Sequence, residues 1–133
     1  MTIVTTSRKP SPEVRKLAKE ISFALDLPYI HRGKAGLRDF EQKDSKIIII
    51  SGSKRGGQIF DIELNGELVF SMLITNIIET DRKGLIKKGF FTREKDLYNY
   101  LSPYVSITFD ESAEGPICFC AAQKKYYVLQ GDV

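Results

Sequence analysis

The fold is decided by one stretch near the start of the chain, Ile3-Val4-Thr5-Thr6-Ser7-Arg8-Lys9-Pro10-Ser11-Pro12. Its first residues are β-branched, which is typical of a buried strand. Ser11 can accept a hydrogen bond from a free N–H group of a helix, and Pro12 suits the first helical position because an N–H there would be unpaired anyway. The stretch therefore predicts a strand, a basic turn and a helix N-terminus. Hydroxyls, cations and N–H groups then converge on one spot, which suits a phosphate; an ordinary surface turn is the alternative.

Hydrophobic spacing predicts a long helix directly after this turn. The helix is expected from about residue 12 to residue 27, because apolar side chains recur every three or four residues. Pro28 is expected to end it, since the residue before a proline avoids the helical conformation. A short strand over residues 28–31 and a short helical piece over residues 37–45 are then expected. The cations off the buried face of the long helix are Arg15, Lys16 and Lys19.

The middle of the chain predicts consecutive strands. Residues 47–50 are four isoleucines, apolar on both faces and therefore expected in the centre of a sheet. The glycine-rich basic loop 51–57 leads into a second strand. Asn65-Gly66 is a strong signal for a tight hairpin, and a long apolar strand over residues 67–78 is expected after it.

The last third predicts one helix and three closing strands. Residues 81–89 are charged and contain two glycines, which is typical of a loop. A helix is expected at residues 93–101, with Thr92 as its N-cap. This helix is expected to bury Leu97, Tyr100 and Leu101, with Tyr98 partly covered. The closing strands are expected at residues 105–109, 117–121 and 126–129.

The length and the order of elements predict one compact α/β domain over residues 1–133. A chain of 133 residues can build one good core but not two ordinary domains. The order strand, helix, strand, strand pair in residues 3–64 recurs in residues 68–130. We therefore consider two similar αβ halves, about 1–66 and 67–133, as a hypothesis.

Charge is unevenly distributed along the chain. Residues 1–60 carry 12 basic and 6 acidic side chains, whereas residues 61–133 carry 8 and 11. A basic first half suggests an anionic partner such as nucleic acid, although solvated surface is an alternative. The longest apolar run, residues 47–50, is too short to span a bilayer, and no signal-peptide pattern is present. We expect a cytoplasmic protein that does not enter a membrane.

No motif predicts catalysis, a metal or a cofactor. In the loop 51–57, Lys54 precedes the glycines and a strand comes after them, unlike the phosphate loop of nucleotide hydrolases. Cys118 and Cys120 share one side of a strand, and too few other ligands are available for zinc. His31 is the sole histidine and has no nucleophile tied to it, so a strand cap, a phosphate contact or packing are its expected roles. An acidic loop could hold a cation or act as acid and base, with an ordinary surface turn as the alternative; its residues are Asp110, Glu111 and Glu114. The tyrosines could stack bases, with packing in the core or sheet as the alternative; they are Tyr98, Tyr100, Tyr104, Tyr126 and Tyr127.

Several of these stretches resemble the Brix domain. The specific part is residues 4–11, Val-Thr-Thr-Ser-Arg-Lys-Pro-Ser, followed by a basic amphipathic helix. Arg32-Gly33 is similar to that family's arginine-glycine after the first helix, and the more diffuse blocks 47–51, 67–73 and 105–109 resemble its later strands. The resemblance implies a single-domain archaeal type with two similar halves, akin to the anticodon-binding domain of class II aminoacyl-tRNA synthetases. It also implies a role in ribosome biogenesis through precursor or mature ribosomal RNA, with pre-ribosomal proteins as further possible partners.

We therefore expect a non-catalytic assembly factor that binds ribosomal RNA without a cofactor or a metal. Contacts to phosphates are expected from the hydroxyls and cations of the first turn and from cations of two later loops. A protein-interaction scaffold, with strand 47–50 or 68–78 as a free edge, and a small nucleotide-handling enzyme are the alternatives. The candidate RNA-binding residues are Thr6, Ser7, Arg8, Lys9, Arg32, Lys34, Lys54 and Arg55.

Overall fold

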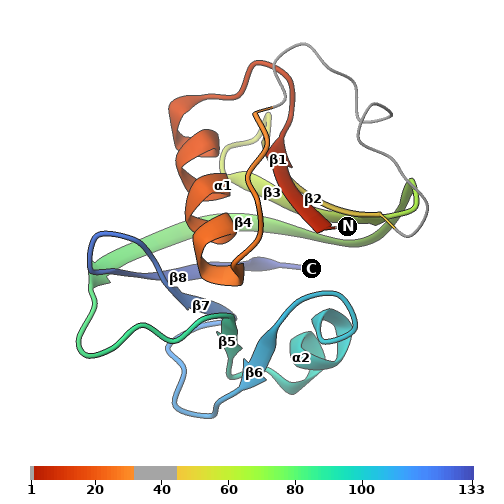
Figure 1. The fold of residues 1–133 in the computed structure, drawn as a ribbon. Helices are drawn as coiled ribbons and strands as arrows, with labels where there is room; N and C mark the ends of the chain where they lie inside the picture. Colours follow the sequence, from red (N-terminus) through yellow and green to blue (C-terminus); the bar gives the residue numbers. More distant parts are fainter. Residues whose placement is uncertain (1, 32–44) are drawn as a thin grey trace.

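A computed structural model describes residues 2–31 and 45–133, and in this part of the chain eight strands form one mixed sheet (Figure 1). Two helices accompany the sheet, which confirms the α/β class and the compact single domain. The elements are β1 (Thr2–Thr6), α1 (Pro12–Leu25), β2 (Lys46–Gly52), β3 (Gln58–Leu64), β4 (Glu67–Asp81), β5 (Phe90–Thr92), α2 (Lys95–Leu101), β6 (Ile107–Phe109), β7 (Ile117–Cys120) and β8 (Lys125–Asp132).

The sheet has the order β1-β2-β3-β4-β8-β7-β5-β6. β1 and β2 are parallel, as are β5 and β6, and the other pairs are antiparallel. The long strand β4 pairs with β3 along its first part and with β8 along its second part, with a register shift between Ile74 and Asn76. This strand therefore connects the half of the sheet that contains β1, β2 and β3 with the half that contains β8, β7, β5 and β6.

One core cluster contains the buried side chains of both helices. Leu17 of α1 and Leu101 of α2 belong to it, and both are almost fully buried. Aromatic rings link the strands of this core, with centroids 6.1 Å apart for Phe60 and Phe90 and 5.6 Å apart for Phe90 and Phe119. The sheet thus curls so that both helices pack into the same interior (Figure 1).

The first helix begins as expected but ends earlier. The Ser11 hydroxyl accepts a hydrogen bond from the Val14 N–H at 3.3 Å, so the predicted cap is present. The helix ends at Leu25 because Asp26 adopts a left-handed conformation, with φ of 57°. The predicted end at residue 27, imposed by Pro28, is therefore wrong by one half-turn. In residues 28–31 the structure shows a single bridge, between Tyr29 and Val4, in place of the expected strand.

The central hairpin is confirmed. Asn65 and Gly66 have φ of 51° and 85° and connect two residues that face each other across the β3–β4 pair, Leu64 and Glu67. The proposed division of the chain near residue 66 falls inside this hairpin. The element order βαβββ occurs twice in the described residues, but the first group is arranged β1-β2-β3-β4 and the second β6-β5-β7-β8. Two similar halves stay a hypothesis.

The second helix is shorter than expected. Thr92 lies in β5 opposite Phe109, so it extends the sheet and does not cap the helix directly. Its hydroxyl accepts a hydrogen bond from the Glu94 N–H at 3.0 Å, and the helix starts only at Lys95. Leu97 and Leu101 are buried as predicted, Tyr98 is half-buried, and Tyr100 is 61% exposed, so its predicted burial is wrong.

Two further expectations have different outcomes. β2 lies between β1 and β3, so it is not a free edge. β4 pairs with β3 only over residues 67–74 and with β8 only over residues 73–81, so each part of β4 has one side without a partner strand among the described residues. The helical piece expected at residues 37–45 lies, except for Ser45, outside the described residues. No helix within the described ranges 2–31 and 45–133 has the length and apolar character needed to cross a membrane.

Candidate nucleic-acid interface

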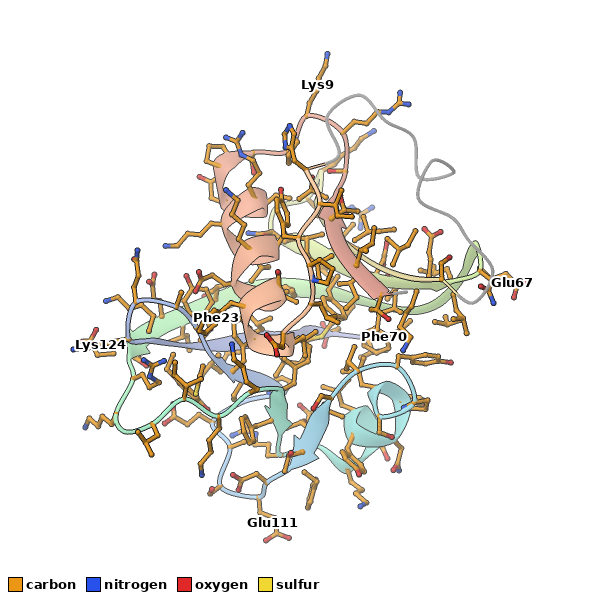
Figure 2. All side chains as sticks on the ribbon, in the orientation of Figure 1. Lys9, Phe23, Glu67, Phe70, Glu111 and Lys124 are labelled. Carbon is orange, nitrogen blue, oxygen red and sulfur yellow. The ribbon has the colours of Figure 1, made fainter. Side chains whose placement is uncertain are left out.

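The turn between β1 and α1 is held by backbone contacts that leave its cations in solvent. The Ser7 N–H donates to the Ile50 carbonyl at 3.0 Å, which fixes the end of β1 to β2. Thr6 is 1% exposed, and its hydroxyl donates to the Ser7 carbonyl at 2.9 Å. Thr6 therefore shapes the turn from inside and is not a surface contact. Arg8 and Lys9 are exposed, and the Lys9 side chain projects away from the molecule (Figure 2).

The glycine-rich loop lies at the same end of the sheet as this turn. β1 and β2 are parallel, so the segments after them leave the sheet at one end. The loop closes through a hydrogen bond from the Ser53 N–H to the Gly57 carbonyl at 3.2 Å. Lys54 and Arg55 at its tip are exposed. The structure thus brings together two pairs of cations that are 45 or more residues apart in the sequence, and we call Arg8, Lys9, Lys54 and Arg55 the basic end.

His31 follows a segment that lies beside β1. The segment before it runs beside β1, because the Ile30 N–H donates to the Val4 carbonyl at 2.9 Å and the Thr5 hydroxyl donates to the Ile30 carbonyl at 2.7 Å. His31 is exposed and leads away from this edge of the sheet. Two predicted contact residues that come next, Arg32 and Lys34, lie outside the described residues.

The contacts of another cation, Lys88, were not predicted from the sequence. The Lys88 ammonium donates to the Phe23 carbonyl at 2.7 Å and lies 3.5 Å from the centroid of the Phe23 ring. The next residue, Gly89, donates its N–H to the Ala24 carbonyl. These contacts satisfy carbonyls at the end of α1, where a positive charge is favourable. The sequence contains no signal for them because the two segments are about 65 residues apart.

The residues considered for catalysis or metal binding are buried or hydrogen-bonded within the fold. Cys118 is buried, which raises the pKa of its thiol, and its Sγ contacts the Gly115 carbonyl at 3.8 Å. Asp110 accepts hydrogen bonds from the Ser112 hydroxyl and the Ser112 N–H, and these hold the pKa of Asp110 below its usual value. Within the described ranges, no three His, Cys, Asp or Glu side chains are grouped as metal ligands would be.

The tyrosines mostly serve the core. Tyr127 is 3% exposed, and burial raises its pKa. Tyr98 packs edge-on against Phe109, with centroids 6.4 Å apart. Tyr100 is largely exposed on α2, away from the basic end. These tyrosines therefore do not form a surface for stacking bases at the basic end.

A separate hollow of about 520 Å³ lies between the connector after β4 and the turn before β7. Its lining includes Lys83 and Lys87, but also Asp110 and Glu114. This hollow has balanced charge, unlike the basic end, and is a weaker candidate for a polyanion.

Comparisons with known proteins agree on one family. The chain is 31% identical over 93 residues to a probable Brix domain-containing ribosomal biogenesis protein of Archaeoglobus fulgidus, and this alignment covers 67% of the chain. The same alignment spans 61% of that relative, which is less than two thirds of its length. A protein of the same description from Methanococcus maripaludis is 26% identical over 140 residues, covering 96% of this chain and 85% of the relative. No protein-family model matches the chain.

Solved structures share the fold. Mil, an archaeal Imp4-like protein, superimposes with a TM-score of 0.65 at 19% identity, covering 96% of each chain. A probable ribosomal biogenesis protein from Aeropyrum pernix superimposes with a TM-score of 0.67 at 13% identity, covering 98% of this chain and 94% of the other. The arrangement of strands and helices in this chain is therefore shared with these two solved structures.

Proposed function

From the premise that the chain belongs to the Brix domain family of ribosome-biogenesis proteins, we propose that it binds ribosomal RNA or its precursor directly, through the basic end, and performs no catalysis. Its role is then to hold a segment of RNA during assembly of a ribosomal subunit. Cytoplasmic location, possible pre-ribosomal protein partners and the likeness to the anticodon-binding domain of class II aminoacyl-tRNA synthetases stay predictions.

The observation that carries this proposal is the convergence of four exposed cations from two loops. Arg8 and Lys9 come from the β1–α1 turn, and Lys54 and Arg55 from the β2–β3 loop. None of the four forms a salt bridge with another residue in the described ranges. Exposed cations without an ion-pair partner in the described ranges are suited to phosphates, which contribute most of the affinity and little sequence specificity.

The test measures how RNA affinity depends on salt. Binding of ribosomal RNA fragments is titrated between about 50 and 400 mM salt, and the slope of log K against log salt gives the number of phosphate contacts. The double variant Arg8→Gln/Lys9→Gln is expected to reduce the slope by about 1.4 for single-stranded RNA, at about 0.7 per contact. The matched control is Arg93→Gln/Lys95→Gln, which removes the same two charges beside α2. Equal slopes for the two double variants would contradict RNA binding at this turn.

A protein-interaction scaffold is the second candidate, and one observation favours it. Three apolar side chains of β4, Leu68, Leu73 and Ile78, are exposed by 59%, 36% and 39%. Exposed apolar groups on one strand are suited to a protein surface. Purified protein that captures a pre-ribosomal protein, and loses it on Leu73→Ser/Ile78→Ser but keeps normal RNA affinity, would support this candidate.

A further inference from the structure

We propose that the RNA-binding surface continues from the basic end along one flank of α1, through Arg15 and Lys19 to the Lys88 ammonium, so that one strand of RNA backbone lies along the helix. This inference rests on the proposed function. It adds three contact residues that the basic end does not include, and it states the shape of the bound RNA.

The helix geometry sets these cations in a row. Arg15 and Lys19 are four residues apart, so they occupy the same face on successive turns. Phe23, labelled in Figure 2, is four residues further on and so lies about one helical turn beyond Lys19. Lys88 delivers its ammonium to that position, 2.7 Å from the Phe23 carbonyl. The backbone positions of Arg15, Lys19 and Phe23, where the Lys88 ammonium lies, therefore follow each other at intervals of about 6 Å, given a rise of 1.5 Å per residue.

The row begins where the basic end stops. α1 starts directly after the turn that carries Arg8 and Lys9 and runs from there to the connector before β5 (Figure 1). Its 14 residues correspond to a length of about 20 Å. The Lys19 ammonium lies 5.7 Å from the centroid of the Tyr29 ring, beside the segment that ends at His31. Lys19 therefore lies beside the segment that ends at His31 as well as on α1.

The neighbouring stripe of the same helix, one residue further along the sequence, is arranged differently. Lys16 forms a salt bridge with Glu79 at 3.4 Å. Glu20 accepts a hydrogen bond from the Ala122 N–H at 3.1 Å and so ties α1 to the β7–β8 hairpin. Charges on that stripe are used to hold the fold together. Arg15 and Lys19, in contrast, are exposed and form no salt bridge with any residue in the part of the chain that the structure describes.

The chemistry of this row favours phosphate contacts over base contacts. The two aromatic rings along the flank, Tyr29 and Phe23, are each approached by a lysine ammonium, so a lysine already covers one face of each ring. What the flank offers is positive charge at regular intervals. A single RNA strand is the partner that presents negative charge in the same way.

The test compares salt slopes on single-stranded RNA of about 16 nucleotides, a length within the range of known single-strand sites. The variants are the turn pair Arg8→Gln/Lys9→Gln, the flank pair Arg15→Gln/Lys19→Gln, the combination of all four changes, and the control Arg93→Gln/Lys95→Gln. Each changed position is exposed, so the fold is expected to persist and is verified by circular dichroism. The flank pair is expected to lower the slope by about 1.4, and affinity at 0.1 M salt by about 25-fold, since two contacts each contribute about 0.7 log units there. The combined variant is expected to lose twice that slope.

The outcomes separate this inference from the proposed function. A flank pair that behaves like the control, next to a turn pair that loses slope, overturns the continuation along α1 and leaves the basic end intact. Four variants with the wild-type slope overturn both. A flank pair that binds RNA normally but no longer binds an acidic polypeptide such as poly-glutamate would assign the flank to an acidic protein, which also overturns the inference.

Discussion

The loop that carries Lys54 and Arg55 is expected to depend on one glycine and to tolerate a change at its neighbour. Gly56 and Gly57 both have positive φ, 91° and 78°. A Cβ added at Gly57 would lie 2.3 Å from the carbonyl oxygen of Ile74, whereas a Cβ at Gly56 would meet no atom within 4 Å. The change to alanine therefore imposes backbone strain at both positions but a clash with the β4 backbone only at Gly57.

The magnitudes come from these two terms. Placing a residue other than glycine in the left-handed region costs about 1–2 kcal/mol. Overpacking against a backbone that cannot move freely adds about 1–3 kcal/mol. Gly56→Ala is thus expected to lower the free energy of unfolding by about 1–2 kcal/mol and Gly57→Ala by about 2–5 kcal/mol. For a domain of this size, each kcal/mol corresponds to roughly 4 °C in Tm.

The assay is urea unfolding of both variants beside the wild type, followed by circular dichroism, with Tm as a second measure. The difference between the variants isolates the contact with Ile74, since the strain term is shared. Equal losses at the two positions would refute the reasoning, because they would mean that the loop moves away from β4 without cost. RNA affinity is measured on the same samples, and Gly56→Ala is expected to leave it unchanged.

Three further predictions concern Lys88, Asp110 and Cys118. Lys88→Met is expected to lower the free energy of unfolding by about 1 kcal/mol, because the Phe23 carbonyl loses its charged partner; Lys87→Met is the control in the same unfolding assay. The pKa of Asp110 is low because of its hydrogen bonds to Ser112, so these bonds stabilise the fold above the unfolded-state pKa, and this contribution is lost as pH falls through the folded-state pKa. The difference in unfolding free energy between wild type and Ser112→Ala is therefore expected to shrink from about pH 6 to about pH 2. A difference that stays constant over this range would contradict the prediction. Cys118 is expected to resist iodoacetamide at about pH 8 in the folded protein and to react fully in urea, because burial raises the pKa of its thiol; mass spectrometry reads the outcome, and rapid native labelling would show that the site opens.

Local signals in the sequence predicted the parts of the fold that local physics controls. Ser11 and Pro12 define the start of α1 because capping needs only the first turn of the helix. Asn65 and Gly66 define the β3–β4 hairpin because both can adopt positive φ. The isoleucines of β2 are buried on both faces, as their continuous apolar run predicts.

The errors arise where distant contacts override local preference. Thr92 has the side chain of a helix cap, but pairing with Phe109 draws it into β5. Tyr100 has the spacing of a buried residue, but α2 is only 7 residues long and buries just Leu97 and Leu101. The candidate site was predicted in part for the same reason. The sequence identified the two basic loops separately, and only the parallel pairing of β1 with β2 brings Arg8 and Lys54 to the same end of the sheet.

Large aromatic residues lie in the core and the described candidate RNA-binding cations lie on the surface, and this distribution affects how RNA can be recognised. Phe60, Phe90 and Phe119 form a connected row inside the core, so these large rings stabilise the fold and are withheld from bases. The cations, in contrast, stand on a turn, a loop and a helix flank whose backbone positions are fixed by the sheet. Contacts of that kind respond to where phosphates lie in space and not to which base each one carries. If the protein selects one segment of ribosomal RNA, we therefore expect it to do so through the path of the RNA backbone, and a folded RNA segment is expected to compete better than an unstructured strand of equal length whenever its backbone already runs along the line from Lys9 to Lys88.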